Sequence, residues 1–188
     1  MTQRNFIDFL VTVGVLKYTT RHCWNPDGER ETVADHSWRL ALMPMLLEKD
    51  FPDVDINKVI RMCIIHDFGE AITGDIPAYL KTDDHEAVER EAIKNLLTNL
   101  PSDLEVEFTA LFAEMDALET KEAKLYKALD NMEALIAHNE ADISTWMPHE
   151  YNDALTYGAD KVEWNDWLKK LREEIVADSV KKINEAKD

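Results

Sequence analysis

Apolar residues recur along most of this chain at intervals of three and four, which places them on one face of a helix. Polar and charged residues occupy the positions between them, so each run is typical of an amphipathic helix. No stretch alternates apolar and polar residues in the manner of a strand. We therefore predict an all-α fold, a single bundle of about six to eight helices. The predicted helices cover residues 5–16, 34–46, 56–72, 82–100, 102–115, 120–138 and 161–182.

Local signals mark where several of these helices begin and bend. Thr32 followed by Asp35 resembles a capping box, and Ser102 followed by Glu105 is a second match. Pro44 lies inside the second helix, where the loss of a backbone donor should kink or split it. The third helix is apolar over most of its circumference, which predicts a central position in the bundle.

Two segments between the helices are candidates for binding. Residues 17–33 contain an Asn-Pro and an Asp-Gly step, which favour turns, so we expect a loop there. The same loop carries Arg21, His22 and Trp24, side chains suited to contacting a ligand. Residues 146–157 are rich in aromatic side chains, and they either cover the core or form a surface for a second copy of the chain.

Length and composition restrict the class of protein. A chain of 188 residues is long enough for one domain with its own core, and 45% hydrophobic and 31% charged residues are ordinary for a globular protein. The apolar runs are too short to cross a bilayer and the polar start is no secretory signal, so we expect no membrane partner. Cys23 and Cys63 lie far apart and outside any CxxC pair, which favours a reducing cytoplasm.

The formal net charge of −17 at pH 7 argues against a nucleic-acid polymer as partner. A polyanion such as DNA or RNA would be repelled, and we see no basic patch that would offset this. A small anionic substrate remains compatible, because a bound divalent cation and one or two arginines can outweigh the distant field. Any phosphate chemistry in this chain must then depend on a metal ion.

His66 and Asp67, at the end of the apolar third helix, supply two metal-ligand groups side by side. Glu70 lies one turn on, so we expect it to share their helical face and to act as an acid or base beside the ion. His36 in the second helix and Asp130 in the sixth are candidates for the remaining ligands. Taken alone, however, a buried histidine is usually a hydrogen-bonded core residue, and an aspartate in a helix is usually a solvated charge.

The other histidines lie in polar or loop contexts, and surface positions are expected for His22, His85, His138 and His149. Asp35 either caps its helix or orients a neighbouring ligand.

Four sequence blocks resemble the 5'-deoxynucleotidase branch of the HD superfamily of metal-dependent phosphohydrolases, whose signature is H…HD…D on an all-helical fold. The blocks are Val33-Ala34-Asp35-His36-Ser37-Trp38, His66-Asp67-Phe68-Gly69-Glu70, Thr73-Gly74-Asp75-Ile76-Pro77 and Lys124-Leu125-Tyr126-Lys127-Ala128-Leu129-Asp130. The resemblance extends over about residues 6–138. It implies a single HD domain over 1–188, with a metal-binding core at about 5–138 and C-terminal helices at about 150–184 packing on it.

The resemblance also implies an activity: hydrolysis of (deoxy)ribonucleoside 5'-monophosphates to nucleoside and phosphate with one divalent ion. The ligands would be His36, His66, Asp67 and Asp130. The catalytic set would be Glu70 as the proton-transferring carboxylate, Arg21 orienting the phosphate and Asp75 contacting the sugar. The implied substrate-binding residues are Arg21, His22, His36, Asp67, Asp75, Ile76, Pro77, Ala78, Lys81 and Asp130.

One position departs from the family. His22 follows Arg21, where the best-known bacterial members carry tryptophan, so a contact from this loop to the sugar or base stays open. Two imidazoles and two carboxylates leave open positions on an octahedral ion, which suits Mn²⁺ or Co²⁺; zinc, iron, nickel and magnesium remain alternatives. The resemblance favours a homodimer.

Two other functions remain open: an HD hydrolase of another nucleotide, such as a phosphodiesterase or alarmone hydrolase, and a non-catalytic, metal-dependent nucleotide sensor. Di-metal members need additional histidines on later helices, and no such block follows Asp67. Glu70 beside a complete ligand set argues against a loss of turnover. A 5'-nucleotidase therefore remains the preferred prediction.

Overall fold

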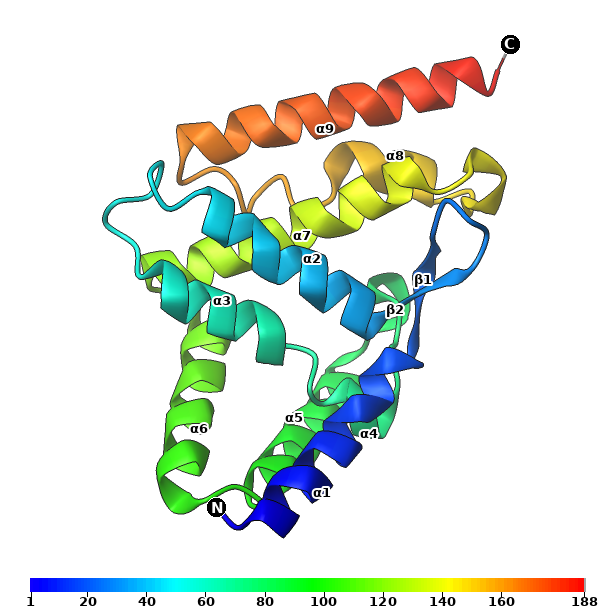
Figure 1. The fold of residues 1–188 in the computed structure, drawn as a ribbon. Coiled ribbons are helices and arrows are strands. Elements are labelled where there is room, and N and C mark those ends of the chain that lie inside the picture. Colours follow the sequence, from blue (N-terminus) through cyan, green and yellow to red (C-terminus); the bar gives the residue numbers. More distant parts are fainter. Residues whose placement is uncertain (188) are drawn as a thin grey trace.

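The computed structural model describes residues 1–187, and helices dominate it (Figure 1). The chain begins with α1, Gln3–Val13, whose first turn is capped by the side chain of Thr2. A short 3₁₀ helix, Gly14–Lys17, continues the same rod with a tighter last turn. The helix predicted over 5–16 is therefore confirmed, and the all-α class holds for the fold as a whole.

Residues 20–32 form a small hairpin that the sequence pattern did not predict. β1, Thr20–Trp24, pairs antiparallel with β2, Arg30–Thr32. The predicted turn lies between them, where Gly28 has a φ of 89°, a conformation that suits glycine. The strands escaped notice because they are short and irregularly paired, so no alternating pattern develops. The expectation that the chain has no strand is wrong at this one place.

α2, Val33–Leu46, begins with the predicted capping box. The hydroxyl of Thr32 accepts a hydrogen bond from the amide of Asp35 at 3.1 Å, and the Asp35 carboxylate accepts from the amide of Thr32 at 3.0 Å. Pro44 does not split the helix, since it lies in the last turn and few hydrogen bonds remain for it to remove.

α3 spans Ile56–Ile65, and the prediction of one helix over 56–72 is wrong beyond that point. The chain leaves the helix at His66, turns, and starts the short helix α4, Glu70–Thr73. The apolar pattern continues across the break because Phe68 in the turn is also buried, so periodicity gave no sign of an end. Glu70 consequently lies on a separate element, not one turn along the same helix.

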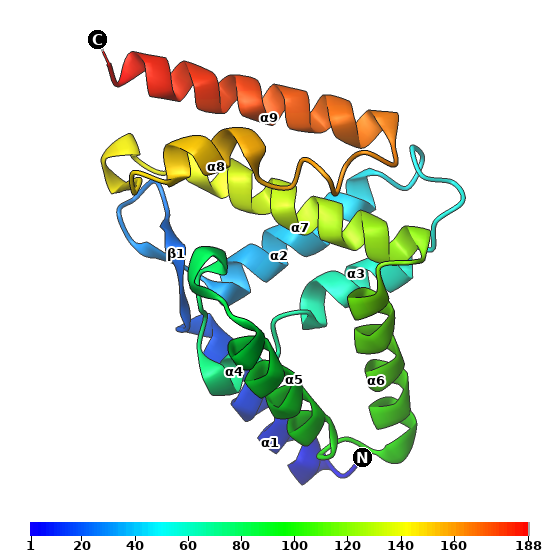
Figure 2. The same ribbon diagram turned by 180° about the vertical axis from the view of Figure 1, so that it is seen from behind.

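α5, Asp83–Leu97, and α6, Ser102–Ala117, extend away from the rest of the molecule (Figure 2). A 3₁₀ helix, Ala78–Leu80, precedes α5. The capping box predicted at Ser102 is wrong: Pro101 holds the N-cap position of α6, and no side chain caps that helix.

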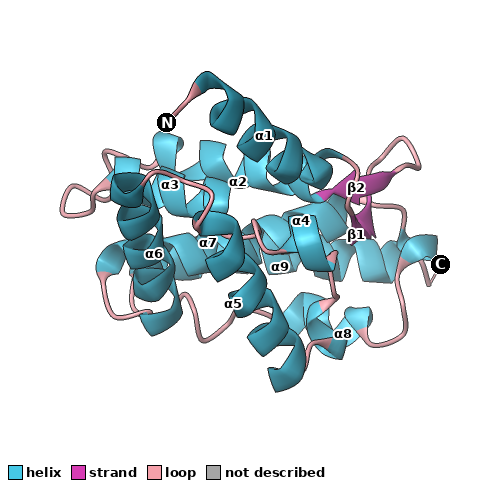
Figure 3. Cartoon of the chain, turned by 90° about the horizontal axis from the view of Figure 1, so that it is seen from below, coloured by secondary structure: helices cyan, strands magenta, loops and turns pink. Residues whose placement is uncertain are grey.

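α7, Lys121–Glu140, is the central helix and packs against α2, α3, α6 and α9 (Figure 1). α8, Glu150–Thr156, and α9, Asp166–Glu185, lie along its far side. The last helix begins later than the predicted residue 161, because Asn165 provides its N-cap. Seen from below, the hairpin stands at one edge of the helices, where β1 contacts α7 and β2 contacts α2 (Figure 3).

One large cluster of buried apolar side chains, with members from Leu16 to Ile175, joins most of these elements, and two smaller clusters lie at Cys23 with Ala137 and at Trp146 with Ala154. α7 contributes several of its members, which fixes the position of Asp130 on that helix. Several residues on the apolar faces of the predicted helices are exposed in this chain: Phe6, Leu10, Trp38, Leu42, Met45, Leu46 and Val88. The apolar faces of α1 and α2 are thus partly uncovered in this single chain. No helix within the described part of the chain has the length and apolar character needed to cross a membrane.

Candidate active site

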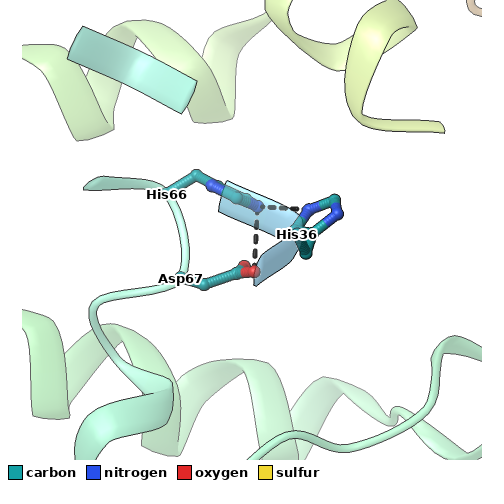
Figure 4. A group of neighbouring side chains, drawn as sticks. All are labelled: His36, His66 and Asp67. Carbon is teal, nitrogen blue, oxygen red and sulfur yellow. Dashed lines mark hydrogen bonds and ion pairs between the residues drawn. The ribbon is translucent and has the colours of Figure 1, made fainter. Parts of the chain in front are cut away.

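Four polar side chains from three parts of the fold converge next to α7. His36 comes from α2, His66 and Asp67 come from the turn after α3, and Asp130 comes from α7. Figure 4 shows the first three pointing toward one another, and one ligand atom of each lies within 4.8 Å of the others. Asp130 Oδ1 lies 3.2 Å from His36 Nε2 and 3.7 Å from His66 Nε2. The predicted H…HD…D residues are therefore brought together.

The hydrogen-bond partners of the two histidines show which ring nitrogen carries the hydrogen and which presents a lone pair. Nδ1 of His36 donates to the carboxylate of Glu133, and Nδ1 of His66 donates to the carbonyl of Cys63 at 2.9 Å. A neutral imidazole carries only one N–H, so Nε2 of each ring presents a lone pair. These two Nε2 atoms are 3.2 Å apart. Two lone pairs at that distance repel unless a proton or a metal ion lies between them, so the donor set fits a divalent cation.

Both aspartates are arranged as charged oxygen ligands. Lys127 Nζ donates to Oδ2 of Asp130 at 2.7 Å, which leaves Oδ1 directed at the histidines. Burial opposes ionisation of Asp130, but Lys127 and His36 outweigh it and hold its pKa well below the usual value. Asp67 Oδ2 is buried and has no hydrogen-bond partner among the described residues, although it lies 2.9 Å from His66 Nε2. Such an orphaned oxygen is what a bound cation would satisfy.

His36 is the group that would hold a proton at this site without a metal. Burial and the charge of Arg21 oppose its protonation, but hydrogen bonds to Asp130 and Glu133 raise its pKa to about 9. A cation that binds at the four ligands must therefore displace this proton.

Glu70 lies beside the cluster in a different electrostatic state. Its side chain is almost fully buried and its Oε2 has no hydrogen-bond partner among the described residues. Burial, followed by the neighbouring carboxylates of Asp67 and Asp75, raises the pKa of Glu70 to about 10. Burial also raises the pKa of Asp75. Burial acts in the same direction on Asp67, but the neighbouring His66, His36 and Arg21 outweigh it and hold the pKa of Asp67 below its usual value. Neighbouring carboxyl groups whose pKa values are shifted in opposite directions, as in Glu70 and Asp67, are typical of acid–base sites.

Arg21 reaches the cluster from β1. Its Nε donates to Glu31 at 3.1 Å, and its Nη1 lies 3.7 Å from Asp67 Oδ2. The backbone carbonyl of Arg21 accepts a hydrogen bond from Arg30 at 2.9 Å, which fixes the strand. The guanidinium is thus held beside the metal-type ligands with part of its planar fork facing the cavity.

A cavity of about 480 Å³ opens above the cluster, a size within the usual range for small-ligand sites. Its wall contains every predicted substrate-binding residue except one: Arg21, His22, Asp67, Asp75, Ile76, Pro77, Ala78, Lys81 and Asp130. The exception is His36, which is fully buried beneath Asp67 and Asp130. Glu70 also lines the wall, whereas His66 lies behind it.

Sequence reasoning missed several charged residues around the ligands. Glu133 is fully buried and joins His36 to Arg39, whose Nε donates to it at 2.7 Å. Glu133 and Lys127 lie three residues to either side of Asp130 on α7, so helical spacing could have identified both. Glu31, which holds Arg21, gave no such signal because its strand was not predicted.

The expectation of surface positions for the remaining histidines is only partly met. His85 is exposed and caps α5, and Asp35 caps α2, as expected. His22, His138 and His149 instead line the cavity, together with Glu150. No local pattern marks them, because they come from three elements that meet only in the fold.

Comparison with known proteins identifies the family to which this chain belongs. A family model described as HD domain matches residues 13–172 of the chain. The chain belongs to the HD domain family. It is 32% identical to the human 5'-deoxynucleotidase HDDC2 over 80% of this chain and 74% of that protein. It is 30% identical to the HDDC2 protein of Dictyostelium discoideum over 80% and 83% of the two chains.

A solved structure supports the same assignment. The predicted metal-dependent phosphohydrolase of Magnetospirillum magnetotacticum MS-1 superposes with a TM-score of 0.82 at 31% identity, over 95% of this chain and 93% of that one. His36, His66-Asp67 and Asp130 of this HD domain thus lie in the order that gives the family its signature, within a fold shared with a phosphohydrolase.

Proposed function

We propose that this HD-domain chain is a metal-dependent 5'-nucleotidase that cleaves deoxyribonucleoside 5'-monophosphates to nucleoside and phosphate. The observation that carries the proposal is the pair of Nε2 atoms of His36 and His66, 3.2 Å apart at the base of a nucleotide-sized cavity. The relatives named 5'-deoxynucleotidase support the reaction class and the substrate.

The proposed ligands of one divalent ion are His36, His66, Asp67 and Asp130. We prefer Mn²⁺ or Co²⁺ over zinc, iron, nickel and magnesium as this ion. Mixed imidazole and carboxylate donors suit these ions, and four protein ligands leave open positions in an octahedral shell. When bound, such an ion would polarise the phosphoryl group and lower the pKa of a water molecule. Lys127 and Glu133 would position Asp130 and His36 for this role.

The chain's own residues account for binding and proton transfer. Arg21 is placed to clamp the non-bridging phosphate oxygens, with Glu31 holding its Nε. Lys81, which pairs with Glu89, adds positive charge to the wall, and Asp75 faces the sugar. Glu70, with its pKa raised to about 10 by burial and neighbouring carboxylates, carries a proton in the metal-free protein. In the metal-loaded protein the same carboxyl group would move the proton, as an acid toward the leaving 5'-oxygen or as a base toward the attacking water.

We also propose that the chain functions as a homodimer. The support is the apolar surface left uncovered on α1 and α2, where Phe6, Trp38 and Leu46 are 52%, 70% and 72% exposed. Surfaces of this kind are usually covered by another chain. The large core cluster, whose members run from Leu16 to Ile175, and the smaller cluster that joins α8 to α9 support one domain over the whole chain. The unpaired thiols Cys23 and Cys63 support a cytoplasmic location.

The test is phosphate release from a panel of nucleotides by the purified protein, with Mn²⁺, Co²⁺, Zn²⁺ or Mg²⁺ added after chelation. We expect release from deoxyribonucleoside 5'-monophosphates and none without metal. Turnover of cyclic dinucleotides or of nucleoside diphosphates instead would support another HD hydrolase. Metal-dependent nucleotide binding without any turnover would support a sensor. Either result contradicts the proposed 5'-nucleotidase.

A further inference from the structure

The cavity continues away from the metal-type ligands to a second group of side chains. They are His22 on β1, Tyr79 on the 3₁₀ helix before α5, His138 on α7, and His149 and Glu150 at the start of α8. We call this group the distal end of the cavity. Nothing in the proposed phosphate chemistry uses it, yet four separate elements converge to build it.

A buried carboxylate lies at the centre of the distal end. Glu150 is only 7% exposed, and its Oε2 accepts a hydrogen bond from the backbone amide of Met147. Its Oε1 lies 3.3 Å from Nε2 of His22 and 3.5 Å from Nε2 of His138. Neither contact has the alignment of a hydrogen bond, and Nε2 of His22 is in addition buried without a hydrogen-bond partner among the described residues. Polar atoms held this close without satisfaction can accept a ligand's hydrogen bonds.

Flat rings enclose the same space. The rings of Tyr79 and His149 lie 4.2 Å apart between centroids, and His22 meets Tyr79 edge-on at 5.5 Å. Nε2 of His149 is also buried without a hydrogen-bond partner among the described residues. Aromatic walls next to unsatisfied polar atoms suit a planar, polar heterocycle.

The two ends of the cavity differ in charge. The Lys and Arg side chains in its described wall are Arg21, Lys81 and Lys127, and their partners Glu31, Glu89 and Asp130 belong to the metal-ligand end or its surroundings. The distal end carries the carboxylates of Glu150 and Asp153, with no lysine or arginine among the residues of the described wall at this end. A second phosphate would be repelled there, whereas a base with hydrogen-bond donors would be favoured.

We propose that the distal end is a nucleobase subsite in which the base packs against the aromatic wall formed by Tyr79 and His149 and Glu150 accepts a hydrogen bond from its exocyclic amino group. The inference rests on the proposed function, because it places the phosphate of a nucleoside monophosphate at the metal-type ligands. It adds what that function does not contain: a preference among bases and the residue that sets it.

The imidazole of His138, next to Glu150, narrows the preference to certain bases. Burial lowers the pKa of His138, so this ring is neutral and offers one donor and one acceptor. A carboxylate beside an imidazole donor matches an amino group next to a ring nitrogen acceptor, the pattern of cytosine and of adenine. Uracil has the same size as cytosine and presents a carbonyl at the amino position. Glu150 would therefore face an acceptor in uracil, and the subsite should favour dCMP over dUMP.

The test compares dCMP with dUMP in the metal-loaded wild-type protein and in two variants. We expect the wild-type KM for dCMP to be roughly tenfold lower than that for dUMP at similar kcat, the size of effect that the net contribution of one hydrogen bond gives. Glu150→Gln keeps an acceptor for the Met147 amide, and it should raise KM for dCMP to about the dUMP value, roughly tenfold. Tyr79→Leu should raise both KM values by a similar factor, because stacking does not distinguish the two bases.

Glu174→Gln is the matched control, since it makes the same change at an exposed position on α9 outside the cavity wall and should keep the dCMP preference. Calorimetric titration of deoxycytidine and deoxyuridine supplies a readout without turnover. If no monophosphate is hydrolysed, the proposed function fails, while tighter binding of deoxycytidine that Glu150→Gln abolishes would still support the subsite. Equal binding of the two nucleosides and equal KM values in the wild type would overturn it. A dCMP preference that survives in Glu150→Gln, or is lost equally in Glu174→Gln, would also overturn it.

Discussion

The carboxylate of Glu133 accepts a hydrogen bond from Nδ1 of His36, and both side chains are fully buried. This contact fixes the imidazole so that Nε2 faces His66, Asp67 and Asp130. The lone pair that a metal ion needs is thus set by a residue that does not itself reach the metal-type cluster.

Replacing this partner should weaken metal binding without removing a ligand. In Glu133→Gln the negative charge behind His36 is lost, and we expect the dissociation constant for Mn²⁺ to rise about 10- to 100-fold. Calorimetric titration of Mn²⁺ into protein freed of metal by a chelator measures this dissociation constant. Glu140→Gln is the control, because Glu140 also pairs with Arg39 but is exposed and does not touch His36. An unchanged Mn²⁺ affinity in Glu133→Gln would contradict the positioning role.

Metal binding should release a proton from His36. The metal-free pKa of this side chain is raised to about 9, so it is charged at neutral pH and must lose its proton before Nε2 can bind a cation. Mn²⁺ affinity should therefore rise with pH, by up to roughly tenfold per unit, and level off above about pH 9. Titrations in buffers of different ionisation enthalpy count the protons released. Release of none near pH 7 would show that His36 is already neutral.

The protonated carboxyl of Glu70 should make the metal-free fold less stable at high pH. Its folded-state pKa of about 10 lies above the ordinary value of 4.5, so its contribution is fully present below about pH 4.5 and is lost as pH rises toward 10. Glu70→Gln does not titrate, and it should therefore raise the metal-free free energy of unfolding by up to about 5 kcal/mol near pH 8, since pH 8 lies about 3.5 units above the ordinary pKa. Urea unfolding at both ends of this range tests the sign. The gain should vanish near pH 4; an equal gain at both pH values would point to packing instead.

The loop before α9 depends on a glycine that approaches α7. Gly158 has a φ of 66°, and a Cβ there would lie 2.8 Å from Cβ of Asn131. Gly158→Ala should lower the free energy of unfolding by about 1–3 kcal/mol through backbone strain and this clash. Gly14→Ala is the matched control, since Gly14 has a φ of −62° and an added Cβ would meet nothing within 4 Å. Urea unfolding measures the free energy of unfolding of both variants. Equal values would contradict the close approach of Gly158 to Asn131.

Local sequence signals predicted what local chemistry determines. The capping box of Thr32 and Asp35 is present as read, because it depends only on four consecutive residues. The break after Ile65 was not predicted, since the buried Phe68 prolongs the apolar pattern through the turn. Trp38 was expected inside because periodicity identifies an apolar face but not what covers it, and in this chain it is 70% exposed.

One part of the site was predicted from the sequence and another part was not. His36, His66, Asp67 and Asp130 were identified because a family resemblance ties their spacing to one fold, and the structure brings them together. The distal end was missed because the contact of His22 with Glu150 joins residues distant in the sequence, from a strand that was not predicted and a short helix. Such convergence follows from tertiary packing and leaves no periodic signal.

The most direct measurement of the central claim combines metal content with turnover in Glu70→Ala. Wild-type protein reconstituted with Mn²⁺ should bind one ion per chain and release phosphate from dAMP. Glu70→Ala should still bind one ion, because Glu70 is not among the four proposed ligands, and should lose phosphate release by at least about 100-fold. Near wild-type release in this variant, or a wild-type protein that binds Mn²⁺ without hydrolysing any deoxyribonucleoside 5'-monophosphate, would contradict the proposed 5'-nucleotidase.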